Sequence, residues 1–414
     1  MVCCGANLHV LMAILVFDSI VLAAFAAWLL VAAVACLCAF NCQLDPPPIE
    51  TGYHPATVVI IPVRGVPEHL NALWRGICAQ IYRPFRIVFA VESVADPAYA
   101  ALQSLADGPP TEIIVAGTTT CRGQKVHNLL AALRTLRSSD AAVVFADADL
   151  VPAADWLMRL IRPLCDPVND VVSGYRWMVP ADERWSTAFV CIANASIATL
   201  ARVRPLNLAW GGSTALRRET LDALRLKECW DRAVLDDLTL TRAVRAQGGH
   251  VYGPRDVLVT TPTACTWKEA IAFGRRQYLL VRMHAPREWL LAASATTLPL
   301  VGWAAAVPLA ATGDKLAIAA LVAANILDHL RAFLRRRVPR KLWGAEMPRR
   351  MAWLDRWGTP AYLAFHAMII WSTLFGRTIA WAGRTYWLNS DQQVIKIREF
   401  AASSGIVRPS VASS

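Results

Sequence analysis

Charged residues are scarce in this sequence. It also lacks the two closely spaced pairs of cysteines that are typical of a zinc site. Only 18% of the 414 residues are charged, whereas 56% are hydrophobic, and the mean hydropathy is +0.37. This composition excludes an ordinary soluble enzyme and predicts membrane segments joined to a folded soluble domain. The 11 cysteines show no zinc-type spacing, and a cytoplasmic domain would keep their thiols reduced. We interpret most of them as small apolar residues of the core.

Long apolar runs are present instead. The first, from about residue 10 to 40, is long enough to cross a bilayer and too long for the core of a cleavable signal peptide. We therefore interpret it as a retained anchor, with Asp18 near the membrane interface, because a carboxylate deeper in the bilayer is costly unless protonated or paired. Three further runs cover about 290–311, 315–330 and 360–375. The middle run is short enough to tilt or to lie partly at the interface.

A strongly basic segment lies between the last two runs. Residues 331–356 contain nine Lys and Arg against two acids, so they supply seven of the 11 net positive charges. A basic excess near membrane ends marks the cytoplasmic side, and counting crossings back from it places 41–287 in the cytoplasm. The same count places the final segment outside the cytoplasm, although one misread helix would reverse that side. Trp343, Trp353 and Trp357 are interleaved with these charges, which favours an anionic membrane surface over nucleic acid as the partner.

These features predict four regions. They are an N-terminal anchor (1–42), a cytoplasmic soluble domain (43–287), C-terminal membrane helices (288–383) with a basic cytoplasmic loop (331–356), and a tail (384–414).

Short β-branched runs alternate with helical spacing across the soluble domain. ATVVIIPV, RIVFAVE, TEIIVAG and AAVVFAD are typical of fully buried parallel strands, and a segment such as QKVHNLLAALRTLR has the spacing of a helix. We expect a doubly wound, mostly parallel α/β sheet, in which ligands bind at the carboxyl ends of the strands. Asp147 and Asp149 in VFADADLVP follow one of these strands. They should therefore point into the binding crevice.

Two carboxylates one residue apart at a strand end suit Mg2+ or Mn2+. These ions bind few protein carboxylates and complete their coordination with substrate phosphates and water. A sugar nucleotide would bring such phosphates. The structural alternative is that Asp149 caps a helix spanning 152–164.

Two further motifs carry charge. Asp236 and Asp237 open a helix that runs to Ala246; adjacent carboxylates raise each other's pKa, which suits a catalytic base, but a helix N-terminus also favours them without catalysis. In FGRRQY, Arg275 and Arg276 could stabilise a leaving diphosphate. Anchoring at the membrane interface is the alternative for both arginines and for Arg282.

Taken in order, these elements resemble the membrane-bound family 2 and family 21 glycosyltransferases, most closely the ceramide glucosyltransferase-like branch, and are similar to hopanoid-associated lipid glycosyltransferases. VVIIPVRG resembles the first strand of that family, VESVADPAY its first acidic motif, and GQKVHNLLAAL its lysine-asparagine segment. FADADL resembles the second acidic motif, AWGGSTALRRETL the Gly-Ser stretch, and LDDLTLTRAV the third acidic motif.

The resemblance implies a GT-A catalytic domain between transmembrane helices, a UDP-sugar donor, a divalent metal, and inversion of the sugar in one displacement. It implies Asp149 as a metal ligand, with Asp147 beside it contacting metal or nucleotide, and Lys125 near the uridine diphosphate. Asp237 would be the base that takes the proton from the acceptor hydroxyl, with Asp236 next to it.

The sequence departs from the family pattern in two places. Ser93 stands where the family often has aspartate, which leaves Glu92 and Asp96 as candidates for uridine or ribose contacts. The last family motif reads Gln/Arg-x-x-Arg-Trp, whereas GRRQY places either Gln277-Tyr278 or Arg276-Gln277 at its Arg-Trp positions. Tyr278 would keep an aromatic platform in the first register, with Arg275 or Arg276 supplying the charge.

The architecture implied by the resemblance suggests a lipid acceptor. Residues 186–203 form an apolar stretch that either lies on the bilayer or is a core helix. We expect transfer of a hexose, glucose above all, to a membrane lipid, with a ceramide-like acceptor favoured. The alternatives are a processive polysaccharide synthase, which would need a wider channel than about four helices form, and a non-catalytic membrane scaffold. The alanine- and arginine-rich composition suggests a bacterial inner membrane.

Overall fold

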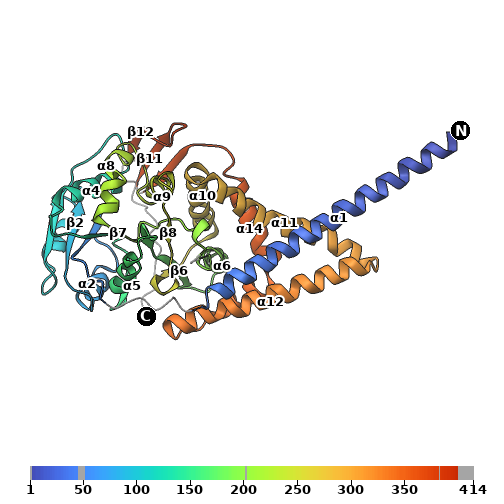
Figure 1. The fold of residues 1–414 in the computed structure, drawn as a ribbon, viewed down its shortest axis with the longest axis horizontal. Coiled ribbons are helices and arrows are strands. Elements are labelled where there is room, and N and C mark those ends of the chain that lie inside the picture. Colours follow the sequence, from blue (N-terminus) through green and yellow to red (C-terminus); the bar gives the residue numbers. More distant parts are fainter. Residues whose placement is uncertain (1, 45–51, 201–202, 382, 400–414) are drawn as a thin grey trace.

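The computed structural model describes residues 2–44, 52–200, 203–381 and 383–399, with side chains from Val16 onward. A rounded α/β domain carries a set of long helices on one side, and α1 (Val2–Asn41) extends farthest from it (Figure 1).

The predicted sheet is confirmed, and it has seven strands in the order β3-β2-β1-β4-β7-β5-β8. All neighbouring pairs are parallel except those made by β7, which runs antiparallel to β4 and β5. The prediction that TEIIVAG is fully buried is wrong, because β3 lies at the edge of the sheet and is partly exposed. The strands are β1 (Thr57–Val63), β2 (Phe85–Val91), β3 (Thr111–Val115), β4 (Ala142–Ala146), β5 (Val171–Ser173), β7 (Ser213–Arg217) and β8 (Val251–Tyr252).

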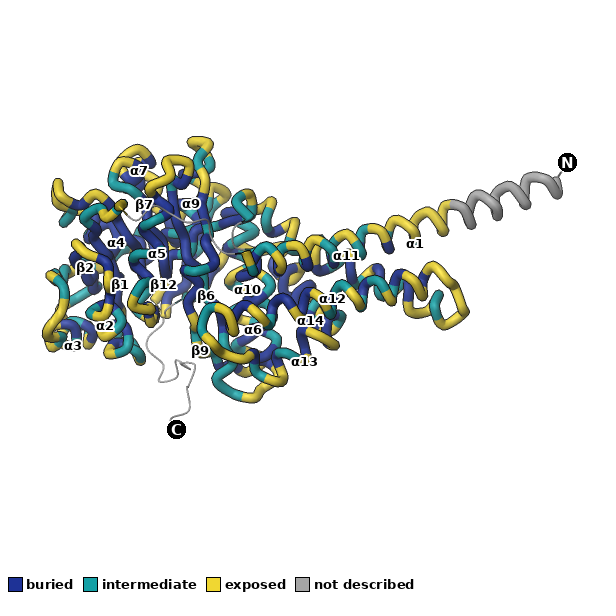
Figure 2. Tube along the Cα trace, turned by 60° about the horizontal axis from the view of Figure 1, so that its bottom comes forward, coloured by how far each residue is buried: buried dark blue, intermediate teal, exposed yellow. Residues whose placement is uncertain are grey.

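Helices cover both faces of this sheet because its strands are apolar on both sides. Val59 and Ile61 of β1 pack with one layer of helices, whereas Val58 and Ile60 pack with the other; successive side chains of a strand point to opposite faces. The first layer holds α2 (Leu70–Cys78), α3 (Pro97–Gln103) and α5 (Trp156–Ile161), and the second holds α4 (Gln124–Ala132), α7 (Arg218–Ala223), α8 (Leu226–Cys229) and α9 (Asp237–Ala246). Figure 2 shows the strands buried between these layers.

A smaller parallel pair of strands, β6 (Tyr175–Pro180) and β9 (Leu258–Thr263), joins the domain to the helices. It packs with α6 (Trp185–Ala198) and α10 (Trp267–His284), which begins with a capping box between Thr266 and Glu269. Most of α6 is buried between β6, α10, α13 (Arg349–Trp357) and α14 (Thr359–Trp371). The core interpretation of 186–203 therefore holds for α6; residues 201–202 lie outside the described residues.

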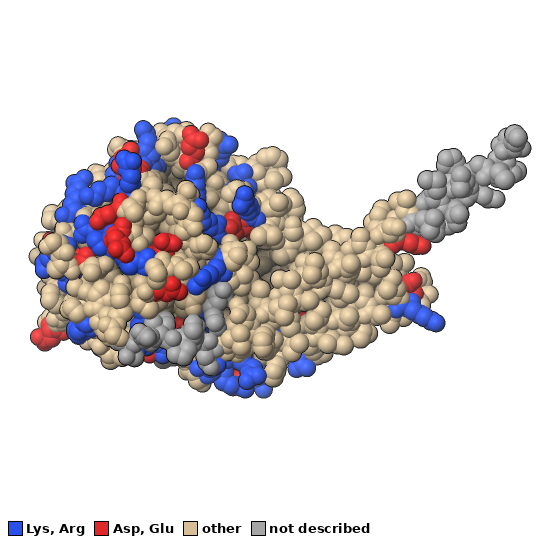
Figure 3. Space-filling model, viewed as in Figure 1, with Lys and Arg blue, Asp and Glu red and all other residues tan. Residues whose placement is uncertain are grey.

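Within the described parts of the chain, three helices are long and apolar enough to cross a membrane: Val16–Asn41 of α1, α11 (Pro286–Ala311) and α12 (Lys315–Trp343). They contact one another, and Trp28 packs against Trp303 with ring centroids 5.1 Å apart. Large apolar side chains stand exposed along all three helices, and the surface over them is almost free of charge (Figure 3). Such a surface fits lipid.

The prediction of a basic loop at 331–356 is wrong, because most of this segment is helical. α12 continues to Trp343, and α13 covers Arg349–Trp357. Arg335 and Asp355 are buried and paired at 2.6 Å, and Arg331 pairs with Asp328. These neutralised charges let α12 continue past its apolar part, since a buried charge is tolerated only when it is paired. The run at 360–375 forms α14 (Thr359–Trp371), whose 13 residues are too few to span a bilayer.

The described residues end in a three-stranded antiparallel sheet, β10 (Thr378–Trp381), β11 (Arg384–Leu388) and β12 (Val394–Glu399). This sheet packs against α9 and α10 (Figure 1). Residues 384–399 are therefore not a separate tail, and counting crossings to place them opposite the soluble domain is wrong because α14 is too short for a fourth span. Residues 400–414 lie outside the described residues.

Candidate functional site

A lysine and two aspartates from distant parts of the chain meet beyond the carboxyl end of β4. Lys125 lies in the first turn of α4, Asp147 directly follows β4, and Asp236 precedes α9. The Lys125 Nζ atom lies 2.7 Å from Asp147 Oδ1 and 3.1 Å from Asp236 Oδ2. The ammonium thus links the second and third acidic motifs into one charged site.

Asp237 is held by backbone groups beside this ion pair. Its Oδ1 accepts a hydrogen bond from the Leu238 amide at 2.7 Å, and its Oδ2 accepts one from the Gly211 amide at 3.2 Å. Glycine at 211 leaves room for this arrangement, because a Cβ atom there would overlap the Asp236 carboxylate and lie 2.6 Å from the Lys125 ammonium, so that one of these side chains would have to shift. The Gly-Gly turn therefore orients the predicted base.

The site shifts the pKa values of Asp237 and Asp147 in opposite directions. Burial, followed by the charge of Asp236, raises the pKa of Asp237 to about 6. Burial also acts to raise the pKa of Asp147, but the Lys125 ammonium outweighs it, and the pKa falls below its usual value. For Lys125, burial is outweighed by the surrounding carboxylates, so its pKa is raised. A charged lysine and an ionised Asp147 thus lie beside an aspartate with the basicity of a catalytic base.

Asp149 lines a second cavity of about 1000 Å³, whereas Asp147 lines the first cavity, which is described below. The described Lys and Arg residues form no ion pair with it, and desolvation together with the Asp147 charge raises its pKa. Its alternative role as a helix cap is wrong, because α5 begins at Trp156 after Asp155. Among the described residues, no group of three or more His, Cys, Asp or Glu side chains is arranged to hold a metal ion. The two carboxylates nevertheless fit a hard divalent cation that takes its other oxygens from a substrate.

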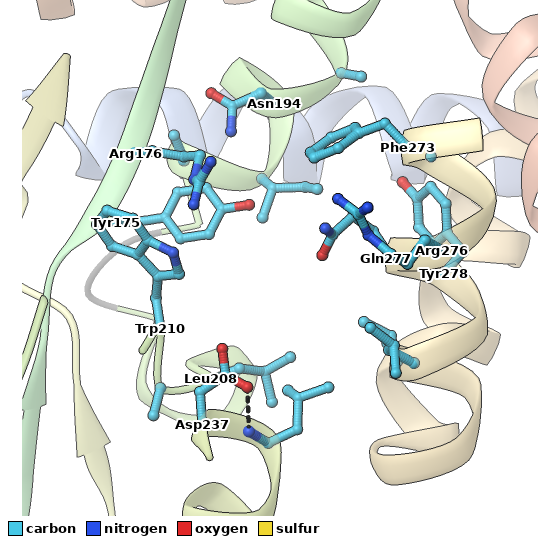
Figure 4. Close-up of a pocket in the computed structure, with 18 of the residues that line it drawn as sticks. Tyr175, Arg176, Asn194, Leu208, Trp210, Asp237, Phe273, Arg276, Gln277 and Tyr278 are labelled. Carbon is cyan, nitrogen blue, oxygen red and sulfur yellow. Dashed lines mark hydrogen bonds between the residues drawn. The ribbon is translucent and has the colours of Figure 1, made fainter. Parts of the chain in front are cut away.

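The first cavity, of about 350 Å³, lies between the catalytic domain and α10 (Figure 4). Asp237 stands at one side of it, and Phe273, Arg276 and Tyr278 face it from α10. Its remaining walls are largely apolar and come from α6, α10, α14 and β10; they include Val190, Ala193, Ile197, Leu280, Phe365, Ile369 and Ile379.

Arg176 on β6 is a site residue that sequence reasoning missed. Its guanidinium stacks on Trp210 at 4.9 Å from the ring centroid and lies 3.9 Å from Asp147 Oδ2. Arg176 and Arg276 line both cavities, from opposite sides of the first (Figure 4). Two cations at the junction of the cavities suit an anionic group such as a diphosphate. The only signal in the sequence is one arginine inside the apolar strand YRWMVP.

The GRRQY motif divides between two sides of α10. Arg276, Gln277 and Tyr278 line the first cavity. Arg275 lines the second and donates to the Ser372 carbonyl at 2.9 Å, beyond the end of α14. Arg282 donates to the Gly376 carbonyl. Arg275 and Arg282 thus hold the segment after α14 by its backbone, whereas Arg276 faces the site.

The first acidic motif lies farther from the cavities. Glu92, directly after β2, pairs with Arg384 of β11 at 2.6 Å. Asp96 caps α3, where its Oδ1 accepts from the amides of Ala98 and Gly65, each at 2.9 Å. The residues that line the two cavities include neither of them.

The mostly parallel sheet with helices on both faces, and the acidic motifs at the carboxyl ends of its strands, form a GT-A-like fold. The chain belongs to glycosyl transferase family 21, whose model matches residues 14–394.

None of the curated proteins shows a significant match to this sequence. Among solved structures, the chain is similar to a mannosyltransferase from Pyrobaculum calidifontis in complex with GDP-Man and Mn2+, with 18% identity and a TM-score of 0.49 over 85% of this chain and 98% of that chain. It is also similar to glucosyl-3-phosphoglycerate synthase from Mycobacterium tuberculosis in complex with Mn2+, UDP and glucosyl-3-phosphoglycerate. That match has 13% identity and a TM-score of 0.36 over 59% of this chain and 88% of that chain.

Proposed function

We propose that this glycosyltransferase moves a hexose, with glucose as the expected sugar, from a UDP-sugar to the hydroxyl group of a membrane lipid, a ceramide-like acceptor being favoured. The observation that carries the proposal is the first cavity: Asp237 stands at its polar side, and its apolar walls come from α6, α10 and α14. α10 and α14 both pack against α11, one of the three long apolar helices. A lipid alcohol could thus reach Asp237 while its chains stay in apolar surroundings.

The proposed reaction is a single displacement at the anomeric carbon. Asp237 accepts the proton of the acceptor hydroxyl while that oxygen forms a bond to C1 of the sugar. The bond from C1 to the diphosphate oxygen breaks at the same time, and UDP leaves with its electron pair, so the configuration at C1 inverts. Lys125, Arg176 and Arg276 would balance the charge that develops on the leaving diphosphate.

Asp149, with Asp147, would hold Mg2+ or Mn2+. The ion would supply Lewis-acid stabilisation of the diphosphate. We expect EDTA to lower transfer by more than about 100-fold, with recovery on adding Mn2+ or Mg2+. Asp149→Asn should raise the metal concentration needed for half-maximal activity by at least about tenfold. Asp155→Asn, which removes a carboxylate outside both cavities, is the matched control; an equal effect of both variants would remove Asp149 from the metal site.

The rate should depend on pH through Asp237. A base acts in its ionised form, so kcat/KM should be constant above a pH of about 6 and fall about tenfold per unit below it. Asp236→Asn removes a charge that raises the Asp237 pKa, so the acidic limb should move to lower pH. A limb that stays in place in this variant would show that another group titrates.

The donor and acceptor can be identified in one assay. Membranes with and without the protein are incubated with a panel of labelled UDP-sugars, and new lipids are extracted and analysed by mass spectrometry. A lipid that carries one added hexose would establish the function and name both substrates, including a ceramide, hopanoid or diacylglycerol acceptor. A long sugar polymer would instead indicate a polysaccharide synthase, and no transfer or hydrolysis of any UDP-sugar would indicate a scaffold.

We also propose that the protein is a multi-pass membrane protein, of a bacterial inner membrane, with its catalytic domain in the cytoplasm. The basic end of α12 and the Arg-rich α13 lie on the side of the catalytic domain, because α13 packs against α6. Lys and Arg gather at this edge of the molecule (Figure 3). A positive excess at the cytoplasmic end of spanning helices supports this orientation.

A further inference from the structure

The C-terminal sheet reaches back to the donor side of the catalytic domain through one buried arginine. Arg384, the first residue of β11, is only 3% exposed. Its Nη2 lies 2.6 Å from Glu92 Oε1, its Nη1 donates to Gln124 Oε1 at 3.0 Å, and its Nε donates to Glu399 Oε1 at 2.7 Å. One guanidinium therefore joins the end of β2, the start of α4 and the last strand of the chain.

Two partners of Arg384, Glu92 and Gln124, belong to the predicted donor site. Glu92 is itself a predicted contact, and Gln124 is the neighbour of Lys125. Glu92 belongs to the first acidic motif at the carboxyl end of β2, where a doubly wound sheet binds its ligand. Gln124 directly precedes Lys125, and its amide nitrogen donates to Asn128 Oδ1 at 2.8 Å and to the Gly117 carbonyl at 2.7 Å. Because the Gln124 oxygen bonds to Arg384, both ends of this amide are held, and the first turn of α4 is fixed.

The same sheet also supports the segment that leads to the base. The Val394 amide donates to the Arg232 carbonyl at 2.9 Å, and Gln393 forms a bridge with Ala233. Tyr386 and Val394 pack in one apolar cluster with Val234, Leu235 and Leu238, which flank Asp236 and Asp237. The C-terminal sheet thus contacts the segments that carry the first and third acidic motifs and the start of α4.

We propose that Arg384 is a positioning residue for the nucleotide half of the donor, acting through Glu92 and Gln124. The guanidinium holds Glu92 by Oε1 and leaves the second carboxylate oxygen to accept a hydrogen bond from the ribose or base. Lysine keeps the charge but lacks the planar fork that reaches three acceptors. This inference rests on the proposed function, because it takes a UDP-sugar as the donor.

The test uses the purified full-length protein in lipid nanodiscs. UDP binding is measured by calorimetry, and KM is measured separately for the UDP-sugar and the lipid acceptor. Arg384→Lys should weaken UDP binding and raise the donor KM by about tenfold to hundredfold, while the acceptor KM changes less than about threefold. Glu92→Gln should also weaken UDP binding and raise the donor KM. The double variant should bind UDP no more weakly than the weaker-binding single variant, because the two residues act as a unit. Arg398→Lys, on the exposed side of β12, is the matched control.

The outcomes separate this inference from the proposed function. If the wild type binds UDP and either Arg384→Lys or Glu92→Gln binds it equally well, Arg384 does not position the donor, although the function stands. A purely structural role would lower the folded fraction and affect both substrates alike, which would also overturn the inference. A wild type that binds no UDP would overturn both proposals.

Discussion

Asp237→Asn is expected to lower kcat for sugar transfer by about 10²- to 10⁴-fold, the range that a positioned general base contributes. The amide keeps the shape of the side chain and can still accept from the Gly211 or Leu238 amide, but it cannot take a proton from the acceptor hydroxyl. UDP binding should change little, since Lys125 and Asp147 remain paired at 2.7 Å. The measurement is single-turnover transfer of labelled sugar to the identified acceptor, together with UDP binding by calorimetry.

Asp222→Asn is the matched control, because that carboxylate is exposed and pairs with Arg218 on the surface of α7. It should leave the rate within about twofold. Residual transfer by Asp237→Asn above about a tenth of the wild-type rate would show that Asp237 is not the base. The neighbouring Asp236 would then be the next carboxylate to test.

Gly211→Ala is expected to lower kcat/KM by about 100-fold, because catalytic groups displaced by about 1 Å lose this much. The added Cβ atom would overlap the Asp236 carboxylate and come within 2.6 Å of the Lys125 ammonium. Either the ion pair or the Gly211 amide that orients Asp237 must move. Steady-state kinetics with both substrates varied would measure the loss.

Gly52→Ala provides the control for a glycine without close neighbours, because a Cβ atom at Gly52 meets no atom within 4 Å. Its kinetics should match the wild type. Thermal unfolding of Gly211→Ala should show a folded protein, so that the loss reflects the site. Near-normal kcat/KM in folded Gly211→Ala would mean that the turn adapts and does not set the position of Asp237.

Local sequence patterns predicted the framework of the fold. The runs that form β1, β2 and β4 consist mostly of apolar residues, and nearly all of their side chains are buried because helices cover both faces of those strands. The edge position of β3 depends on strand order, which the run TEIIVAG does not encode. β7 was not expected as a strand, since its residues were interpreted only as a Gly-Ser motif.

The candidate site could be predicted where its chemistry lies in short motifs. Lys125, Asp147 and Asp236 were each predicted site residues, and they prove to be in direct contact. Arg176 and Arg384 could not be placed in advance, because an arginine gains its role from neighbours distant in the chain. Arg384 and Glu92, for example, are 292 residues apart in sequence.

The sequence by itself determined that apolar helices flank an α/β domain and that carboxylates stand at its strand ends, because run length, side-chain period and strand termini are local properties. Only the tertiary structure decided how far α12 extends, because Arg335 is tolerated in the helix through a buried partner, Asp355, on α13. It also decided that the C-terminal strands return to the end of β2 and the start of α4. That placement depends on the buried contacts of Arg384 and Tyr386 with segments distant in the chain, and no local pattern records such contacts.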